Sequence, residues 1–375
     1  MTHRPNIGLK KYPTMNDVAV VVGVHPTTVS LALRSHPSIP LATRTRILDA
    51  VREIGYIRDP LLDAFNYHRC CKQTAKQVAS IAFVADAKSA PFFNGSSYHT
   101  LVYEGIRAVA DPQHLSLEVF NLGANGLTPS RLNTILTSRG ITGVLLSTFT
   151  LATKDIDLDW QNYSTVKIES HHLLPQMDVV SNDQCQAARL CMRKLRQLGY
   201  RRIGLATALD DESRLLDNFS TGVLVEQAEM PAAECVAPLL FKRTNVAEIA
   251  ARLAEWVRGN DVDVIMTNWN EFFREASWLT TEGIRFPTNP PLHIPRDVAF
   301  ASLDAPADRP HVAGIVQNHK LVGMRAMEHL EVLVKTYQRG APKNPSGTYV
   351  PGYWRDGVTV PKKIVRRTRV RGVSL

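Results

Sequence analysis

The chain has little cysteine and no long apolar segment, and both absences limit what it can be. Its five cysteines are odd in number and contain no Cys-x-x-Cys spacing. This pattern argues against a disulfide scaffold and a thiolate zinc site, and it is typical of reduced thiols in a cytoplasm. The N-terminal residues include Arg4 and Lys10 but no apolar signal-peptide core, and no run of about 18 apolar residues occurs. We expect a cytoplasmic protein with no membrane partner.

Motifs that carry enzyme chemistry are missing as well. The sequence has no Gly-x-Ser-x-Gly nucleophile motif, no phosphate-binding loop, no Gly-x-Gly-x-x-Gly after a first strand and no His-Glu-x-x-His. His171 and His172 stand at a predicted strand end without a second cluster of metal ligands. We therefore expect no enzyme activity, no cofactor and no metal site, which leaves binding as the function.

The positive charge of the chain is concentrated at its two ends. The formal net charge is +9; residues 1–76 carry +6 and residues 362–375 carry another +6, so the middle of the chain is at −3. This distribution is expected of a nucleic-acid-binding head on a near-neutral body. The C-terminal tail, 362–375, is interpreted as a solvated, disordered end, because a run of charge alone is weak support for a binding site.

Three short amphipathic helices are predicted near the N-terminus. Residues 15–22 repeat apolar side chains at helical spacing, Gly23 interrupts the pattern, and Pro26 opens a second helix, since proline's missing N–H is harmless in a first helical turn. A third helix is expected over residues 43–55, with Ile47 inward and a stop at Gly55. Its outward residues are expected to be Arg44, Arg46 and Arg52. This order predicts a helix-turn-helix domain over residues 1–56.

This N-terminal segment resembles the lactose-repressor (LacI/GalR) family of bacterial transcription regulators. The matching residues follow the family's order without a gap and are Asp17-Val18-Ala19, Gly23-Val24, Thr28-Val29-Ser30, Thr43-Arg44 and Gly55-Tyr56. The resemblance implies that the second helix enters the major groove of a double-stranded, pseudo-palindromic DNA operator. It also implies a homodimer, because one short helix alone reads too few bases.

The resemblance also assigns DNA contacts to individual residues. Base edges or the groove wall would be met by Pro26, Thr27, Ser30 and Leu31, and phosphates by Thr14, Asn16, Thr28 and Thr43, with Tyr56 as a further DNA-binding residue. The family usually has Ser at the position of His25 and Arg at the position of Leu31, so a base-reading guanidinium is missing here. Arg34 is a candidate replacement one turn further on, although an Arg at a helix end is commonly a surface residue.

Residues 57–77 are expected to form a hinge helix and a linker. By the same resemblance, the segment from Pro60 to Phe65 would open the minor groove at the centre of the operator, with Leu62 and Phe65 as apolar contact and wedge. So short a helix is not stable by itself, so the hinge should order only with a partner hinge on DNA. The alternative for Phe65 is that it packs under the core.

Residues 78–361 alternate between apolar strands and amphipathic helices. Strands are expected at residues 78–84, 115–121, 143–146, 165–169, 203–207, 262–267 and 298–303, and helices at 98–110, 129–139, 184–198, 213–229, 246–257, 270–282 and 321–338. Repeated strand and helix units predict an α/β fold in which helices cover both faces of parallel sheets. These units are too many for one compact core, so we expect two subdomains with a cleft between them.

Polar residues follow several of these strands, at the edge where parallel sheets bind ligands. The candidate effector-binding residues are Asp86, Glu169, Arg214, Asn268, Trp269, Asp304 and Gln317. A carboxylate and an Arg that face each other above an aromatic ring suit a sugar, whose hydroxyls need paired donors and acceptors and whose C–H face stacks on a ring. Polar residues crowd strand ends in every α/β protein, however, so each candidate also has a purely structural explanation.

The same part of the chain is similar to the effector-binding core of the LacI/GalR family, itself similar to periplasmic sugar-binding proteins. The matches lie at residues 180–183, 198–203, 263–268, 294–298 and 322–323. The resemblance places Arg214, Asn268 and Asp304 at the effector site. It implies a DNA-binding regulator, a repressor, whose operator affinity is controlled by a small-molecule effector, a sugar.

Departures from the family pattern leave the type of ligand open. Ser302-Leu303-Asp304 stands where the family has Gly-Tyr/Phe-Asp, and Gln317-Asn318 stands where it has Gln-Asp/Pro. Asp183 is expected to cap a helix rather than to contact a ligand. The alternative function is a solute-binding or sugar-binding protein with no DNA-dependent role, but such a protein would have no use for a helix-turn-helix.

Overall fold

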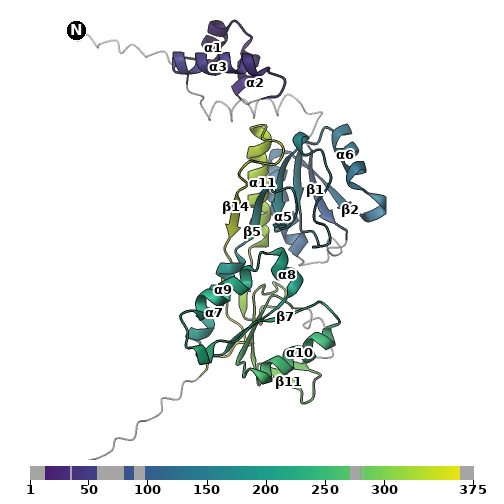
Figure 1. Cartoon of the computed structure of the whole chain (residues 1–375), viewed down its shortest axis with the longest axis vertical. Helices are drawn as coiled ribbons and strands as arrows, with labels where there is room; N and C mark the ends of the chain where they lie inside the picture. Colours follow the sequence, from purple (N-terminus) through teal and green to yellow (C-terminus); the bar gives the residue numbers. More distant parts are fainter. Residues whose placement is uncertain are drawn as a thin grey trace, which may run out of the picture.

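A computed structural model describes residues 13–33, 36–56, 80–87, 98–270, 279–280 and 283–363 (Figure 1). Several predictions lie outside these described residues. They are the hinge and linker at 57–77 with Leu62 and Phe65, the whole of Arg34, and all but the first two residues of the basic tail. The described part nevertheless contains every other residue predicted to bind DNA or an effector.

The N-terminal head is a three-helix domain, which confirms the predicted helix-turn-helix. Its helices are α1 (Met15–Val22), α2 (Pro26–Leu33) and α3 (Leu41–Ile54). Gly23 and Gly55 end α1 and α3 in the left-handed conformation, at φ 72° and 68°, which glycine adopts without strain. The helices meet around one apolar core made of Val18, Ala19, Val22, Val29, Ala32, Ile39, Ile47 and Ala50.

Of the three arginines of α3 predicted to face outward, Arg46 and Arg52 are exposed and Arg44 is the exception. Arg44 is half-buried and donates from Nη2 to the carbonyl of His36 at 3.0 Å, and Arg46 donates to the carbonyl of Val22 at 3.1 Å. Both side chains therefore bind backbone oxygens within the head, that of His36 in the loop after α2 and that of Val22 at the end of α1. Arg52 is exposed, as expected, and pairs with Asp49.

No single helix among the described residues is long and apolar enough to cross a membrane. The first two helices pass that test only as a pair bent by 104°. The apolar stripes of both helices are buried in the core of the head, as Val18 and Val29 show with no exposed surface.

The first α/β unit contains a six-stranded parallel sheet in the order β14-β5-β4-β3-β1-β2. Its strands are β1 (Ser80–Asp86), β2 (Ser116–Leu122), β3 (Gly143–Leu146), β4 (Ser164–Ile168), β5 (Asp178–Asn182) and β14 (Gly347–Val350). On one face lie α5 (Tyr98–Ala110) and α11 (His319–Lys335), and on the other lies α6 (Pro129–Ser138). Alternate residues of β1 enter the two apolar cores, Ile81 and Phe83 on one face and Ala82 and Val84 on the other.

Helices α5 and α11 cross backbone to backbone, because glycine occupies both sides of the contact. A Cβ on Gly105 would lie 1.9 Å from the carbonyl oxygen of Lys320, and one on Gly323 would lie 2.0 Å from that of Val102. The first turns of α11, with His319, are therefore held in a fixed position against α5.

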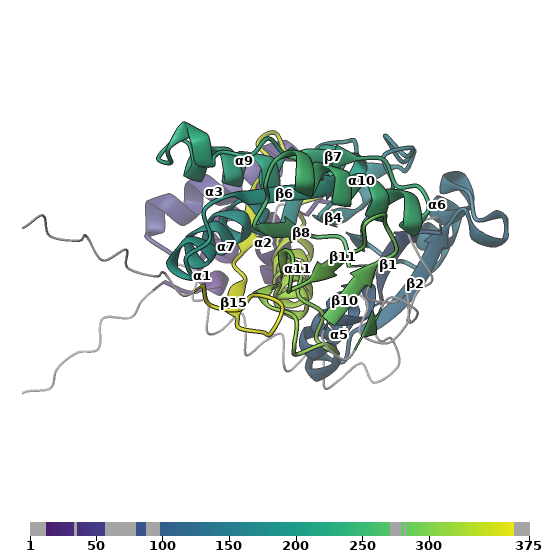
Figure 2. The ribbon, with the colours of Figure 1, turned by 90° about the horizontal axis from the view of Figure 1, so that it is seen from below.

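The second α/β unit repeats this architecture around a sheet in the order β15-β13-β12-β8-β6-β7. Its strands are β6 (Ile203–Ala208), β7 (Leu239–Phe241), β8 (Val264–Thr267), β12 (Ala299–Ser302), β13 (Gly314–Val316) and β15 (Tyr353–Arg355), and only β15 is antiparallel to its neighbour. Figure 2 shows α7 (Gln184–Gln197) and α10 (Val246–Gly259) on opposite sides of β6 and β8. A small antiparallel sheet joins β9 (Leu279–Thr280), β10 (Gly283–Phe286) and β11 (Leu292–Ile294).

The predicted alternation and fold class are confirmed, with two corrections to the helices. The helix expected over 213–229 is two helices, α8 (Leu209–Arg214) and α9 (Asn218–Gln227), because Leu216 and Asp217 adopt positive φ and interrupt the helical path. The helix expected over 270–282 is wrong at Leu279–Thr280, which pair as a strand with β10. Residues 271–278, 281 and 282 of that prediction lie outside the described residues.

Besides β9, seven short strands of the described residues were not predicted: β5, β7, β10, β11, β13, β14 and β15. Each has only three to five residues, too few for an apolar period to stand out from its surroundings. The edge strands β14 and β15 also lie far along the chain from their partners, β5 and β13.

Within the described residues, the chain passes between the two units at three places, which lie together. The first passage follows β5, the second precedes α11, and the third joins β14 to β15. The amide of Asp183 donates to the carbonyl of Val350 at 2.9 Å, and the side-chain amide of Asn318 donates to that of Pro351. Direct hydrogen bonds between the passages therefore fix this junction.

Candidate functional site

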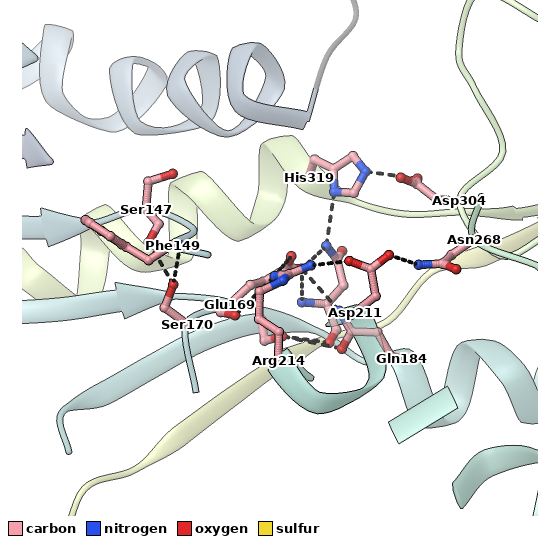
Figure 3. A network of polar contacts seen from close by, with 12 residues as sticks. Ser147, Phe149, Glu169, Ser170, Gln184, Asp211, Arg214, Asn268, Asp304 and His319 are labelled. Carbon is pink, nitrogen blue, oxygen red and sulfur yellow. Dashed lines mark hydrogen bonds and ion pairs between the residues drawn. The ribbon is translucent and has the colours of Figure 1, made fainter. Parts of the chain in front are cut away.

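Four predicted site residues follow parallel strands of the two sheets. Asp86 ends β1 and Glu169 follows β4 in the first unit, while Asn268 follows β8 and Asp304 follows β12 in the second. The last three belong to one network of polar contacts that joins the units, drawn in Figure 3. This site is where sequence reasoning expects a ligand, at the carboxyl ends of parallel strands.

Glu169 is a buried acceptor at the centre of the network. Its Oε1 accepts from the backbone N–H of Asn182 at 3.1 Å, from the side-chain amide of Asn182 at 2.6 Å and from that of Gln184 at 3.2 Å. Its φ of 52° lies in the left-handed region, which a glutamate seldom occupies and which is strained. Strain that the surroundings hold in place is often found at functional sites.

Asp211 gathers three donors in the second unit. It accepts from Arg243 Nη2 at 2.6 Å, from Asn268 Nδ2 at 2.9 Å and from Arg214 Nη2 at 3.5 Å. Burial opposes the charge of this carboxylate, but Arg243 and Arg214 outweigh that effect and lower the pKa of Asp211. Asp211 is therefore an ionised anchor for two guanidinium groups.

Arg214 connects the two units. Its Nη1 donates to the carbonyl of Glu169 at 3.3 Å and lies 3.9 Å from the carboxylate Oε2 of the same residue. Because Arg214 also contacts Asp211, one guanidinium lies between a carboxylate of each unit. A change in the separation of the units would alter these distances directly.

His319, the first residue of α11, makes a second connection. Its Nε2 lies 2.9 Å from Asp304 Oδ1, and its Nδ1 lies 3.0 Å from Asn182 Nδ2. The Asn182 amide has two N–H groups, one directed at Glu169 and one at His319, so Nδ1 accepts and the neutral ring carries its proton on Nε2. Burial disfavours the imidazolium, but the Asp304 carboxylate outweighs it and raises the pKa of His319.

The walls of the site beside the network are fixed by buried hydroxyls and rings. Ser170 Oγ donates to the carbonyl of Ser147 at 2.9 Å and accepts from the amide of Phe149 at 3.1 Å, which ties the ends of β3 and β4 (Figure 3). Tyr98 packs edge to face on His319, with ring centroids 4.9 Å apart. Burial, and next the charge of Glu169, raise the pKa of Tyr98, so its phenol stays protonated.

The other predicted effector residues are placed differently. Asp86 is buried and accepts from the amide and hydroxyl of Thr150 at 3.1 and 2.9 Å. Gln317 donates to the carbonyl of Leu303 at 2.8 Å, and its Oε1 is buried with no partner among the described residues. Trp269 is not an exposed stacking surface: it is 4% exposed and packs in an apolar core against Phe241.

Sequence reasoning missed several members of the network, namely Tyr98, Asn182, Gln184, Asp211, Arg243 and His319. A partial signal existed for Asp211, because it lies three residues before Arg214 in a short helix after β6. Asn182 lies in the matched segment 180–183, beside Asp183. As expected, Asp183 caps α7, accepting from the amide of Gln186 at 2.9 Å.

The histidine pair outside the network is held by aromatic and backbone contacts. His171 stacks on the ring of Tyr349, with centroids 6.2 Å apart, and His172 Nε2 lies 3.3 Å from the carbonyl of Thr150. Burial lowers the pKa of both rings, so they are neutral near pH 7. Within the part of the chain that the structure describes, no group of three metal-ligating side chains comes together.

On the head, the predicted DNA-contacting residues lie at the surface. Thr14, Asn16 and Thr27 are exposed, and Pro26, Thr28, Ser30, Leu31, Thr43 and Tyr56 are half-buried. Thr14 also caps α1: its hydroxyl donates to Asp17 Oδ2 at 2.7 Å and accepts from the Asp17 amide at 3.4 Å. Leu31 and Tyr56 pack partly against the apolar core of the head.

Comparison with known proteins agrees with this architecture. Residues 14–59 match the sequence model of "Bacterial regulatory proteins, lacI family". The N-terminal head of this chain is therefore similar in sequence to that family. That match covers the three helices of the head, and the following comparisons extend beyond the head.

The curated relatives are distant. The maltose regulon regulatory protein MalI of Escherichia coli is 24% identical over 192 residues, 51% of this chain and 52% of that protein. The transcriptional regulator GntR of Pseudomonas aeruginosa is 33% identical over 109 residues, 29% of this chain and 28% of that protein. The chain thus spans about half the length, or less, of the curated relatives it matches.

Solved structures share the fold over nearly the whole chain. A complex of the transcriptional regulator CelR with cellobiose is 19% identical, with a TM-score of 0.53, and the match covers 91% of this chain and 98% of that one. The lac repressor dimer bound to operator and an anti-inducer is 15% identical, with a TM-score of 0.50 over 94% and 100% of the two chains. At such low identity these likenesses show a common fold.

Proposed function

We propose that this protein is a sequence-specific transcriptional repressor whose affinity for a DNA operator is controlled by a small carbohydrate effector. The observation that carries the proposal is one chain that combines a lacI-type helix-turn-helix head with a polar network joining two α/β units. The head supplies DNA binding, and the network supplies a place where a ligand contacts both units at once. No enzymatic step is part of this function, and we propose that it operates in the cytoplasm.

For the DNA-binding side, we propose the assignment made from the sequence. Residues 1–56 form the DNA-binding domain, with α2 in the major groove, and 57–77 connect it to the effector core at 78–361. The exposed hydroxyls and amide of Thr14, Asn16 and Thr27 support phosphate and base contacts at this surface. A homodimer on a pseudo-palindromic site follows from the few bases that one short helix can read.

For the effector side, we propose that Arg214, Asn268 and Asp304 contact the ligand, with Glu169 holding the site in shape. The network offers donors and acceptors from both units, which suits a molecule bearing several hydroxyl groups. Similar folds have been solved with cellobiose and with ribose. A ligand that prefers one arrangement of the two units shifts the equilibrium toward it, and the linker would pass that change to the paired heads.

Fluorescence anisotropy on duplexes selected from a random pool tests the function. The full chain should bind selected DNA with an affinity that falls steeply with salt, since phosphate contacts release counterions. A variant lacking residues 1–65 should not bind, while its far-ultraviolet circular dichroism shows that the core is folded. Retention of DNA binding by the truncated protein would overturn the assignment. Binding by the full chain that no carbohydrate alters would leave the DNA function and remove the effector proposal.

A further inference from the structure

The N-terminal head contacts the α/β core at the turn that follows helix α11. The ring of Tyr337 in this turn packs edge to face on the ring of His36, with centroids 4.7 Å apart and planes inclined by 76°. His36 belongs to the head and lies in the loop between α2 and α3. Figure 1 shows the head beside the end of α11 that points away from the second unit. A side chain of the core therefore touches the segment that joins α2 to α3.

Tyr337 occupies a backbone position that usually belongs to glycine. The end of α11 is closed by the amide of Gln338, which donates to the carbonyl of Leu333 at 2.9 Å, and Tyr337 has φ 55°. Such a left-handed turn after a helix favours glycine, because a side chain there is strained. The ring contacts His36, and the guanidinium carbon of Arg339 lies 6.0 Å from its centroid. Strain in a folded protein is a reason to look for a function, and the contact with the head supplies one for this ring.

The turn after α11 is fixed to the first α/β unit. The amide of Gly340 donates to the carbonyl of Tyr163 at 3.0 Å, and the hydroxyl of Ser164 donates to the carbonyl of Gln338 at 2.8 Å. Helix α11 is itself in backbone contact with α5, and its first residue, His319, belongs to the polar network. The aromatic ring is therefore presented to the head from a rigid part of the core.

His36 is held equally firmly within the head. Its Nδ1 accepts from the amide of Ser38 at 3.2 Å and lies 2.7 Å from the hydroxyl oxygen of the same residue. Its own amide donates to the carbonyl of Leu31 in α2 at 2.9 Å, and its carbonyl accepts from Arg44 of α3 at 3.0 Å. Both helices thus hold the loop, so a contact at this imidazole fixes the orientation of α2 relative to the core.

This contact lies beside the surface that we assign to DNA. His36 follows the end of α2 by three residues, and Thr43, a proposed phosphate contact, precedes the Arg44 that binds the carbonyl of His36. A helix in a major groove about 12 Å wide has a sugar-phosphate backbone on each side of it. A duplex seated on α2 would therefore compete with the turn after α11 for the space next to His36.

We propose that the contact between His36 and Tyr337 holds the head in a docked state that does not bind DNA, and that DNA binding breaks this contact. The proposal rests on DNA binding by the head, as proposed above, and adds a device that restrains it. DNA selects the released head, so the apparent affinity falls by the fraction of molecules that are docked. One edge-to-face ring pair is a weak interaction, so loss of either ring should raise DNA affinity about two- to tenfold.

Fluorescence anisotropy of the full chain with duplexes selected from a random pool tests the core side of the contact. Tyr337→Gly removes the ring and should bind DNA about two- to tenfold more tightly than the parent. Its melting temperature should not fall, because glycine adopts the left-handed turn without strain. Tyr337→Phe keeps a ring and should keep the parental affinity. Val332→Ala is the matched control, since Val332 is 54% exposed near the end of the same helix, and should change neither property.

His36→Asn tests the head side of the contact. Asparagine keeps an acceptor for the amide of Ser38 but has no ring, so the loop should persist while DNA affinity rises about two- to tenfold. Combined with Tyr337→Gly it should give no further gain, because both substitutions remove one interaction. Additive gains would overturn the pairing of the two residues.

The outcomes also separate this proposal from the DNA-binding function. Equal or weaker DNA binding by Tyr337→Gly, with the parent binding DNA, would overturn the docked state and leave the function standing. Binding by Tyr337→Gly alone would support the docked state in its strongest form. If neither the parent nor Tyr337→Gly bound any duplex, the DNA-binding function and this inference would fall together.

Discussion

The head and the polar network are built in opposite ways. The head buries apolar side chains and leaves polar groups outside: Val18, Val29 and Ile47 have no exposed surface, while Thr14 and Asn16 face solvent. The network buries charged and amide groups between two α/β units, and its members come from residues as distant as Tyr98 and His319. The head is held by non-directional apolar contacts, and the network by directional ones.

This difference has a consequence for how each region responds to change. An apolar core loses stability in proportion to the surface and volume removed, with little effect on neighbouring domains. A buried polar network leaves donors or acceptors unpaired when one member is lost, and the loss is felt wherever those partners lie. A destabilising substitution in the head should therefore unfold the whole head. A substitution in the network should alter contacts in both α/β units.

The largest expected effect is on the head. Ile47→Ala removes a fully buried side chain from a small core, in which eight of the described residues are buried, and should destabilise the head by about 3 kcal/mol. A domain this small has little stability to lose, so operator binding at 25 °C should nearly disappear. Anisotropy with selected DNA measures the binding, and the thermal unfolding of the α/β core, followed by circular dichroism, should not move.

Val20→Ala is the matched control for that change. Val20 lies on α1 of the same head but is 81% exposed, so its truncation should alter stability by less than about 0.5 kcal/mol. If Ile47→Ala lowered the melting temperature of the core as well, the head and the core would be energetically coupled and the contrast between the regions would fail.

A smaller loss of stability is expected from a substitution in the network, but it should weaken ligand binding as well. Asp211→Ala leaves Arg214, Arg243 and Asn268 without their shared acceptor. Removing one partner of a buried pair costs about 3–5 kcal/mol, and the half-exposed Arg243 reduces this to about 2–3 kcal/mol. Urea unfolding of the full chain measures the loss, and carbohydrate binding by calorimetry should be weakened with it.

Asp210→Ala controls for the charge change, since Asp210 is the exposed neighbour in the same helix. Equal losses of stability in Asp210→Ala and Asp211→Ala would show that the hydrogen bonds and ion pairs of Asp211 make no specific contribution to stability. Loss of stability with unchanged carbohydrate affinity would separate the network from the binding site.

The sequence was sufficient to predict the head and the fold class for a physical reason. The residues that form the core of the head lie within about forty positions, and their spacing reports helical faces directly. The alternation of strands and helices likewise depends on local periodicity. The break between α8 and α9 was not predicted, because Leu216 and Asp217 adopt positive φ. Glycine is the residue that usually indicates such a conformation in a sequence, and neither residue is a glycine.

The site could be predicted only in part. Strand ends pointed to Glu169, Asn268 and Asp304, but their partners depend on how distant segments meet, and no local pattern encodes that Asp304 faces His319. Trp269 shows the limit most clearly. Successive residues at a strand end point to opposite sides, so Asn268 reaches the network while its neighbour enters the apolar core.

A buried lysine near the network gives a prediction in which the substitution raises the stability of the protein instead of lowering it. Lys167 is 1% exposed, and burial lowers its pKa from 10.5 to about 8. The unfolded lysine keeps its proton up to pH 10.5, so between pH 8 and 10.5 the unfolded state binds more protons and stability rises with pH. Lys167→Met should stabilise the protein by about 1–2 kcal/mol at pH 7. The stability of this variant should no longer increase between pH 8 and 10.5 through this group.

Urea unfolding of both proteins at pH 7, 8 and 10 measures the difference, and groups that titrate in both cancel. The free-energy gap between variant and parent should be widest at pH 7 and narrow toward pH 10. A gap that stays constant would mean that the lysine titrates normally, and a less stable variant at every pH would mean that its hydrogen bond to Leu173 outweighs its burial.

The smallest effect tests whether a surface residue of the head serves stability, DNA binding or both. Thr14→Ala removes the N-cap of α1 and should destabilise the head by about 1 kcal/mol. If the hydroxyl also contacts a phosphate, DNA affinity should fall roughly two- to tenfold on every sequence alike, because phosphate contacts carry no base information. Thr14→Ser keeps the hydroxyl and should restore both. A variant that loses stability but keeps its affinity, measured where the head remains folded, would leave Thr14 as a helix cap alone and move the phosphate contacts to its neighbours.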